Sequence, residues 1–380
     1  MLTDPSEGYL IRVLASVMDP AGMEVEMSNR MVLVLAVLCA IAAPGVVSTA
    51  AAQARASDAG QWEVPRTPDG HPDLQGNWSN STLTPFERRE DHGPVYTWEE
   101  VDAIERPAGQ SDGCPANPGT VMCGRTARTT GTDAARLSGQ EYNEVYWERG
   151  SRVAIVDGEP RASLITHPAD GRRPALTPEA ERLVEERRDF RSQFEQYDHP
   201  ELRPFAERCL LFGGPGPPIL PVGAYNSNYR IVQTADHLMI MSEMIHDTRI
   251  IRIGDPRPIP EDVRPWFGDS WGRWEGDVLV VETTNINPVQ TLRGVPPSKN
   301  MKVTERFTRV DEETILYEFT VEDPSRYTQA WGGEIPMMKL HAQVYEYACH
   351  EGNYSLAGVL SGARYGERME AQGSSDSNRD

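Results

Sequence analysis

The sequence predicts a mainly β protein in which an antiparallel meander closes into a β-barrel, preceded by long irregular arms. Three observations support this fold class. Short segments of alternating apolar residues follow one another from Tyr229 onward, and short polar turns separate them. The 380 residues include 32 Gly and 30 Pro, which indicates many turns. Strands and helices do not alternate along the chain, so a parallel α/β sheet is disfavoured.

Residues 1–54 are expected to be an over-called start followed by a cleaved signal peptide. Met31–Val47 is almost wholly apolar, follows Arg30, and is followed by Ala52-Gln53-Ala54, the small-residue pattern of a cleavage site. About 17 apolar residues are short for a membrane span of about 20. We therefore expect a periplasmic or secreted protein without stable membrane insertion after signal cleavage.

The excess of acidic over basic residues limits the classes of molecule that the protein is expected to bind. The chain carries 57 acidic and 37 basic residues and a formal net charge of −20. Nucleic acids and anionic membranes need a concentrated basic surface, so neither is an expected partner.

Residues 55–223 read as an arm region with about two helices and a possible first barrel strand. Thr97-Trp98-Glu99-Glu100 is a capping box that begins one helix. Thr177 is the expected cap of the second helix, with Pro178 at its first position. Its expected buried face comprises Ala180, Leu183, Val184, Phe190 and Phe194. The Gly- and Pro-rich run 213–218 is interpreted as a rigid connector.

Residues 224–366 are expected to form the barrel, whose closure would remove exposed strand edges. Residues 367–380 are expected to be a disordered tail. The predicted strands are Tyr229–Thr234, His237–Met244, Arg249–Ile253, Trp271–Glu275, Val278–Asn285, Lys302–Arg309, Thr314–Glu322, Met338–Cys349 and Tyr354–Leu360.

The G-x-W motif Gly76-Asn77-Trp78 resembles the first-strand signature of lipocalin-like (calycin-like) barrels. This resemblance implies that Trp78 plugs the barrel floor and that a basic side chain from the last strand region covers it. Arg364 is the expected basic residue.

A wider set of segments resembles a large family of exported bacterial proteins. The resemblance implies export and a barrel but supplies no catalytic assignment. The segments that carry it are 65–76, 225–229, 243–247, 274–277, 305–309 and 347–354.

Four cysteines remain once residues 1–54 are removed. An even number in an exported protein favours disulfides. We expect Cys114 to pair with Cys123 and Cys209 with Cys349. A metal site at Cys349-His350 is the rival interpretation, although the chain has no C-x-x-C spacing.

The densest polar cluster comprises Glu243, His246, Asp247 and Arg249, which are the predicted catalytic residues. A histidine beside carboxylates suits a general base, because the carboxylate fixes its tautomer and raises its basicity. Arg249 would then clamp a carboxylate or an enolate. The alternative is plain turn chemistry, with Asp247 capping its own turn and His246 in solvent.

Charged residues on the strands form a second candidate set. Glu282, Arg306 and Glu318 alternate with apolar neighbours, so they share one face of their strands. That face is either the solvated outside, which we favour, or a polar barrel interior that binds substrate. The other predicted substrate-binding residues are Tyr225, Asn228, His341 and Trp331.

The expected function is that of an exported protein with a pocket for a small organic molecule. The leading hypothesis is a cofactor-independent enzyme that performs elimination, hydration or isomerisation by acid–base chemistry. The alternatives are a periplasmic carrier without turnover and a metalloenzyme ligated by His246, His341 or His350, although no tight His-x-His pair is present. The chain has no G-x-S-x-G elbow, Walker loop or G-x-G-x-x-G motif, which disfavours hydrolases, kinases and dinucleotide dehydrogenases.

Overall fold

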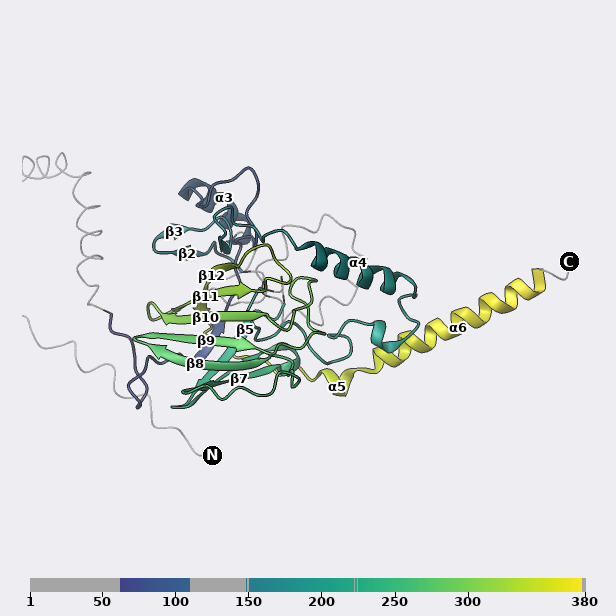
Figure 1. Cartoon of the computed structure of the whole chain (residues 1–380). Coiled ribbons are helices and arrows are strands. Elements are labelled where there is room, and N and C mark those ends of the chain that lie inside the picture. Colours follow the sequence, from purple (N-terminus) through teal and green to yellow (C-terminus); the bar gives the residue numbers. More distant parts are fainter. Residues whose placement is uncertain (1–61, 110–147, 149, 222, 224, 378–380) are drawn as a thin grey trace, which may run out of the picture. The chain divides into compact units, whose positions relative to one another are not determined.

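The computed structural model describes residues 62–109, 148, 150–221, 223 and 225–377, and within them nine strands close into a β-barrel (Figure 1). Hydrogen bonds join each strand to the next, and the last pairs with the first. Around the barrel the order is β1 (Gly76–Ser79), β5 (Asn228–Gln233), β6 (His237–Ser242), β7 (Thr248–Ile253), β8 (Asp269–Glu275), β9 (Val278–Thr284), β10 (Lys302–Arg309), β11 (Thr314–Glu322) and β12 (Trp331–Lys339). The mainly β class and the closed barrel are thus confirmed.

One pair of neighbouring strands departs from the predicted antiparallel meander. β7 and β8 are parallel, with Arg252 opposite Trp271. Segment 254–268, which contains four prolines, joins these two strands in place of a short turn. A connection of this length returns the chain to the end where β7 began, so β8 runs in the same direction.

Alternate residues of each strand fill the barrel. In β10 and β11, Val303, Phe307, Ile315 and Tyr317 are fully buried, while the residues on the opposite face of each strand are half-exposed. This period of two is what a strand with one face on a core requires. The barrel is therefore packed with side chains along these strands.

Trp78 of the G-x-W segment lies in the barrel core, close to the end of β10. It is fully buried, and its Nε1 donates to the Leu74 carbonyl at 3.0 Å. The guanidinium of Arg309, at the end of β10, lies 5.0 Å from its ring centre. The expectation that Arg364 covers Trp78 is wrong, because Arg364 lies on a helix and bonds Glu367 and the Asp198 carbonyl.

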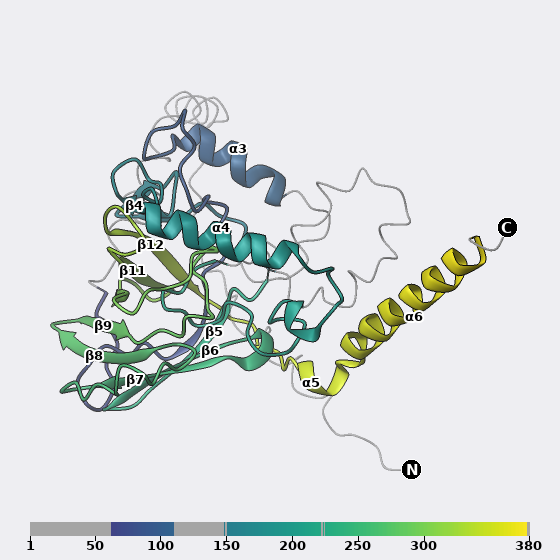
Figure 2. The same ribbon diagram turned by 45° about the vertical axis from the view of Figure 1, so that its right-hand side comes forward.

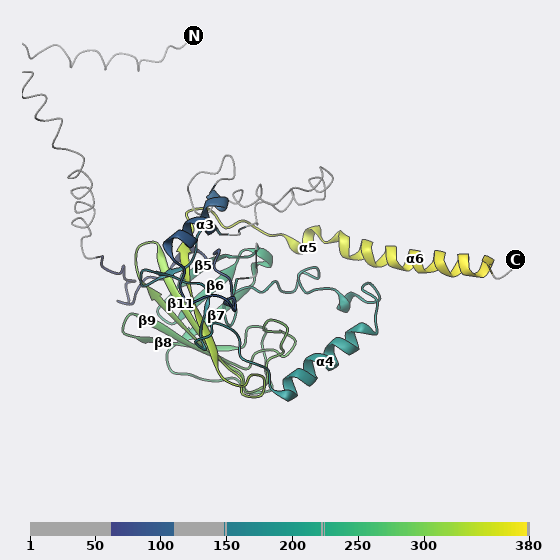
Figure 3. The same cartoon turned by 90° about the horizontal axis from the view of Figure 1, so that it is seen from above.

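Two predicted strands near the C-terminus are wrong. The strand expected over Met338–Cys349 is absent beyond Lys339, since residues 340–348 form neither helix nor strand, and the segment Tyr354–Leu360 is helical. The last barrel strand ends at Lys339, and α5 (Cys349–Gly352) and α6 (Tyr354–Ser377) follow (Figures 2 and 3). Leu356, Val359 and Leu360 recur at helical spacing, so the predicted strand over 354–360 misread the period. α6 also continues through most of the segment for which disorder was expected.

The disulfide between Cys209 and Cys349 is present, with Cα atoms 5.7 Å apart. It joins the arm region to the start of α5, so the predicted pairing is confirmed. Cys114 and Cys123 lie outside the described residues.

The two predicted helices begin as expected. α3 (Trp98–Gly109) has the capping box, in which Glu100 Oε2 accepts from the Thr97 backbone N–H at 2.7 Å. α4 (Pro178–Ser192) begins at the Thr177 cap, whose hydroxyl accepts from Ala180 N–H at 3.2 Å. The predicted buried face of α4 is wrong at its end, because Phe190 and Phe194 are exposed and pack on each other.

The remaining elements are short. They are β2 (Ile155–Val156) and β3 (Glu159–Pro160), which pair with each other, β4 (Ile165–His167), which pairs with β12, and the 3₁₀ turns η3 (Pro200–Leu202) and η4 (Met244–His246). Among the described helices, none has the length and apolar character needed to cross a membrane.

Candidate functional site

Residues 211–221, the mouth segment, cover the barrel end opposite Trp78. Three barrel side chains hold this segment. Asp247 Oδ2 accepts from Phe212 N–H at 3.2 Å, Arg249 Nη1 donates to the Pro215 carbonyl at 3.2 Å, and Tyr317 OH accepts from Ile219 N–H at 2.8 Å. The segment is therefore fixed in place over the barrel.

A cavity of 360 Å³ lies between the mouth segment, residues 204–206 and the loop 286–301. It reaches Met301 at the start of β10, whereas Arg309, which covers Trp78, ends that strand. Most of its wall is apolar, and the larger apolar side chains are Phe205, Leu211, Phe212, Leu220, Ile286 and Leu292. The polar side chains in the wall are Gln290, Thr291 and Arg293.

The wall formed by the mouth segment depends on glycine. Gly214 has a φ of +59°, and a Cβ there would lie 3.0 Å from both Cβ and Oδ2 of Asp247. A side chain at this position would be strained and would press on the carboxyl group. Gly214 thus brings the cavity wall and Asp247 into direct contact.

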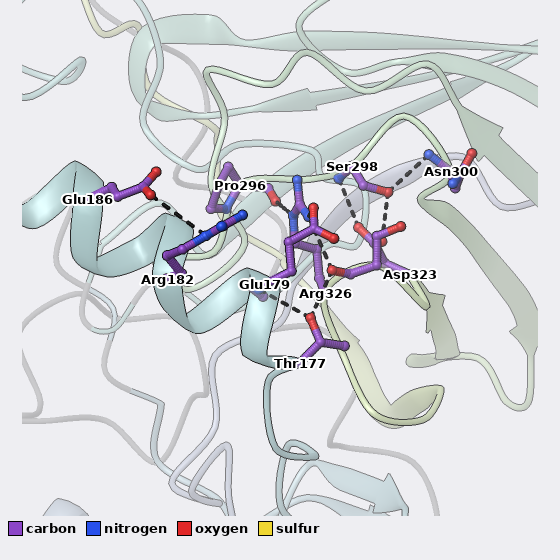
Figure 4. A network of polar contacts seen from close by, with 11 residues as sticks. Thr177, Glu179, Arg182, Glu186, Pro296, Ser298, Asn300, Asp323 and Arg326 are labelled. Atoms are coloured by element: carbon purple, nitrogen blue, oxygen red, sulfur yellow. Dashed lines mark hydrogen bonds and ion pairs between the residues drawn. The ribbon is translucent and has the colours of Figure 1, made fainter.

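The opposite wall is fixed by a polar network around the buried Asp323 (Figure 4). Its carboxylate accepts from the Ser298 backbone at 2.9 Å and from the Ser298 hydroxyl at 2.7 Å. Arg326 donates to the Pro296 carbonyl at 3.0 Å and reaches Glu179 of α4 at 3.5 Å. Because α4, the β11–β12 loop and the cavity loop hold one another, the cavity is preformed.

Arg293 is the charged residue of the cavity wall. It occupies a tight turn between Leu292 and Val295 with a φ of +51°, a conformation that is uncommon for non-glycine residues. Its Nη2 donates to the Pro221 carbonyl at 3.0 Å, and its guanidinium lies 4.3 Å from the ring centre of Phe86. Arg293 is exposed overall, and partial desolvation together with the nearby Arg173 lowers its pKa.

The four predicted catalytic residues do not converge on one point. His246 is exposed and has a φ of +47°. Glu243 and Asp247 bond different partners: Glu243 bonds Asn228 and the Tyr345 N–H, and Asp247 bonds the Phe212 N–H. Arg249 is two residues beyond Asp247 on β7 and points into the barrel, where it is 2% exposed. The predicted role of Arg249 as a substrate clamp is wrong, because protein groups take up its donors.

Arg249 is the centre of a buried polar network. It donates to both oxygens of Glu305, at 2.9 and 2.5 Å, to Ser270 at 3.0 Å and to Thr283 at 2.7 Å. Tyr317 OH donates to Glu305 at 2.9 Å, and burial together with this carboxylate raises the pKa of Tyr317 well above its usual value. Sequence reasoning missed Glu305, although it shares the alternating core face with Val303 and Phe307.

Two predicted residues do meet at the start of β5. Asn228 Nδ2 donates to Glu243 Oε2 at 3.0 Å, and Glu243 Oε1 accepts from Tyr345 N–H at 2.9 Å. Glu148, which accepts from the Ser81 hydroxyl at 2.9 Å, lies close enough to raise the pKa of Glu243 further. Burial is the main cause of the raised pKa of both carboxyl groups.

The carboxyl group of Asp247 accepts a hydrogen bond from Phe212, a residue of the cavity wall. Burial raises its pKa from 3.8 to about 6, against smaller opposite effects of the Phe212 N–H and His246. A carboxyl group with this pKa exchanges protons near neutral pH, as acid–base catalysis requires.

The charged strand residues lie on the outside of the barrel. Arg306 lies 3.4 Å from Glu275 and 4.0 Å from Glu318, and Glu282 lies 3.3 Å from Arg273. All of these side chains are partly exposed. The favoured interpretation of these residues as solvated cross-strand pairs agrees with this placement, and a polar barrel interior lined by them does not.

The other predicted binding residues are dispersed. Trp331 is fully buried among Phe86, Phe319 and Tyr327. His341 is exposed and lies 2.6 Å from Glu313. Tyr225 packs beside Phe212, a residue of the cavity wall, with ring centres 6.3 Å apart.

Among the described residues, no three His, Cys, Asp or Glu side chains gather in a way that would hold a metal ion. His246, His341 and His350 therefore do not form the metal site that one hypothesis required. Comparisons with protein-family models, curated proteins and solved structures gave no match to this chain. The cavity and the carboxyl group behind its wall are thus the features from which we infer a function.

Proposed function

We propose that this protein is an exported binding protein that holds a small organic molecule in the mouth cavity. The cavity itself carries this proposal. Its volume of 360 Å³ falls within the range of about 300–1,000 Å³ typical of small-molecule sites. A mainly apolar wall with a few polar groups is also typical of such sites.

The fixed walls of the cavity support binding. Asp247, Arg249 and Tyr317 hold one wall, and Asp323 and Arg326 hold the other. A preformed cavity loses little conformational entropy when a ligand enters, so more of the contact energy contributes to affinity.

Export is part of the proposal. The apolar segment near the start of the sequence supports it, and so does the Cys209–Cys349 disulfide, because disulfides persist mainly in oxidising compartments. Amino-terminal sequencing of the periplasmic protein tests it, and the expected first residue is Arg55.

Acid–base catalysis on the bound molecule is the second candidate function, and Asp247 is the observation that favours it. Its pKa of about 6 suits proton transfer, and it bonds the backbone of Phe212 in the cavity wall. Once a substrate is found, Asp247→Asn should abolish turnover but preserve binding. Full activity in this variant would exclude Asp247 as the catalytic acid or base.

Binding is tested with the neutral fluorescent probe N-phenyl-1-naphthylamine. The wild type should bind it at one site, and Leu220→Trp should weaken binding at least about 10-fold, because the larger side chain fills the cavity. Leu210→Trp is the matched control, since Leu210 is exposed and outside the cavity wall. Equal binding by all three proteins would overturn the proposal.

A further inference from the structure

We infer that the ligand of the mouth cavity carries one anionic group on an apolar body, and that Arg293 binds this group. The inference rests on the proposed function, because it names the chemical class of the bound molecule. It requires that Arg293 forms no ion pair with a carboxylate of the protein and that its guanidinium faces the cavity.

Arg293 has no carboxylate partner within 4.0 Å among the described residues. The nearest carboxylate to influence it is Glu87, which is already bound to Arg173 at 2.6 Å. Arg173 adds a second positive charge close to Arg293. Two cations close together repel each other, and an anion bound in the cavity would relieve this repulsion.

The position of Arg293 leaves donors for a ligand. An arginine has five N–H donors, and Nη2 of Arg293 donates to Pro221, a residue of the cavity wall. The Phe86 ring stacks at 4.3 Å and fixes the plane of the guanidinium. A guanidinium held in this way can bind a carboxylate or sulfonate through two parallel hydrogen bonds.

The rest of the cavity wall selects against other classes of molecule. Arg293 is the sole charged side chain among the residues that line the described cavity, so a cationic ligand would meet repulsion without compensation. The large apolar area disfavours a small, fully polar anion such as phosphate. Because the protein has a formal net charge of −20, attraction of an anion has to come from local groups.

The backbone of Arg293 supports a functional role. Its left-handed conformation at φ +51° suits glycine or asparagine better than arginine. Residues in such conformations are held by the surrounding structure and are concentrated at active and binding sites.

Two probes that differ by one sulfonate test the inference: 1-anilinonaphthalene-8-sulfonate and the neutral N-phenyl-1-naphthylamine. The wild type should bind the sulfonate probe more tightly. Arg293→Gln should weaken its binding roughly 10- to 100-fold and change binding of the neutral probe less than about 3-fold. Arg257→Gln, at an exposed arginine outside the cavity wall, is the matched control and should change neither.

The outcomes separate the two proposals. If neither probe binds, or if Leu220→Trp affects neither, the proposed function fails and the inference fails with it. If both probes bind in a manner sensitive to Leu220→Trp, but Arg293→Gln leaves their relative affinity unchanged, the cavity binds ligands and the anionic class is wrong. Thermal denaturation of Arg293→Gln establishes that the variant is folded.

Discussion

The guanidinium of Arg249 and the carboxylate of Glu305 form a two-point ion pair inside the barrel, with both side chains at most 1% exposed. Ser270, Thr283, Tyr317 and the Pro215 carbonyl complete their hydrogen bonds. The pair, together with its partners, therefore occupies part of the barrel interior. It also links β7 and β10 to the mouth segment, which forms the cavity wall.

Removal of one partner of this pair should destabilise the protein strongly. Glu305→Gln should lower the free energy of unfolding by about 3–5 kcal/mol, because Arg249 remains buried without a counter-charge. Glu318→Gln is the matched control on the outer face and should change it by less than about 1 kcal/mol. Urea denaturation of the two variants provides the measurement, and similar losses in both would contradict this account.

A double variant separates the charge effect from packing. Arg249→Met combined with Glu305→Leu removes both buried charges, so it should be less destabilised than the additive sum of its single variants. An additive result would show that the ion pair is not the source of the effect.

The stability of the protein should depend on the titration of Asp247. Its pKa is raised to about 6 in the folded state, so the folded protein binds the proton more tightly than the unfolded chain does. Its contribution to stability is therefore most favourable below about pH 4 and is lost as the pH rises through about 6. Asp247→Asn should flatten the pH dependence in this window, as measured by urea denaturation at several pH values. Asp255→Asn, at an exposed site, should leave the dependence unchanged.

Reduction of the Cys209–Cys349 disulfide should lower the melting temperature. The two cysteines are 140 residues apart in the sequence. A disulfide that closes a loop of this length restricts the unfolded chain, which stabilises the folded protein by on the order of 2–5 kcal/mol. A reductant should therefore destabilise the wild type and the Cys114→Ser/Cys123→Ser variant alike. If reductant lowers the melting temperature of the Cys209→Ser/Cys349→Ser variant as much as that of the wild type, another disulfide is responsible for the loss of stability.

Trp78 should contribute strongly to the stability of the barrel. Trp78→Ala removes a fully buried ring and should cost about 3–5 kcal/mol of unfolding free energy. Trp98→Ala provides the comparison, since Trp98 is 59% exposed on α3 and its loss should cost less than about 1 kcal/mol. A small effect of Trp78→Ala on the free energy of unfolding would show that the stability of the barrel does not depend on this ring.

Local patterns predicted much of the fold. The alternation in β10 and β11, the caps at Thr97 and Thr177 and the Cys209–Cys349 pair all appear in the structure. These features depend on neighbouring residues or on simple counting, which a sequence displays directly. The parallel β7–β8 pair was not predictable in this way, because a meander is assumed wherever strands follow one another.

The candidate site was harder to predict than the fold. The cavity wall combines Phe205, Leu220 and Arg293, which are far apart in the sequence and carry no motif. Glu243 and Asn228 were selected for separate roles, and the structure joins them by a hydrogen bond. Arg249 was assigned to a pocket, because its burial beside Glu305 depends on β10, a strand distant in sequence. The Asp247 carboxyl was selected for its neighbours in the turn, whereas its raised pKa comes from burial in the structure.

A crystal structure of the protein with bound N-phenyl-1-naphthylamine tests the central claim most directly. We predict electron density for one probe molecule between the mouth segment and the loop 286–301, in contact with Leu220 and Leu292. Probe density at a different site, with this cavity empty, would contradict the account.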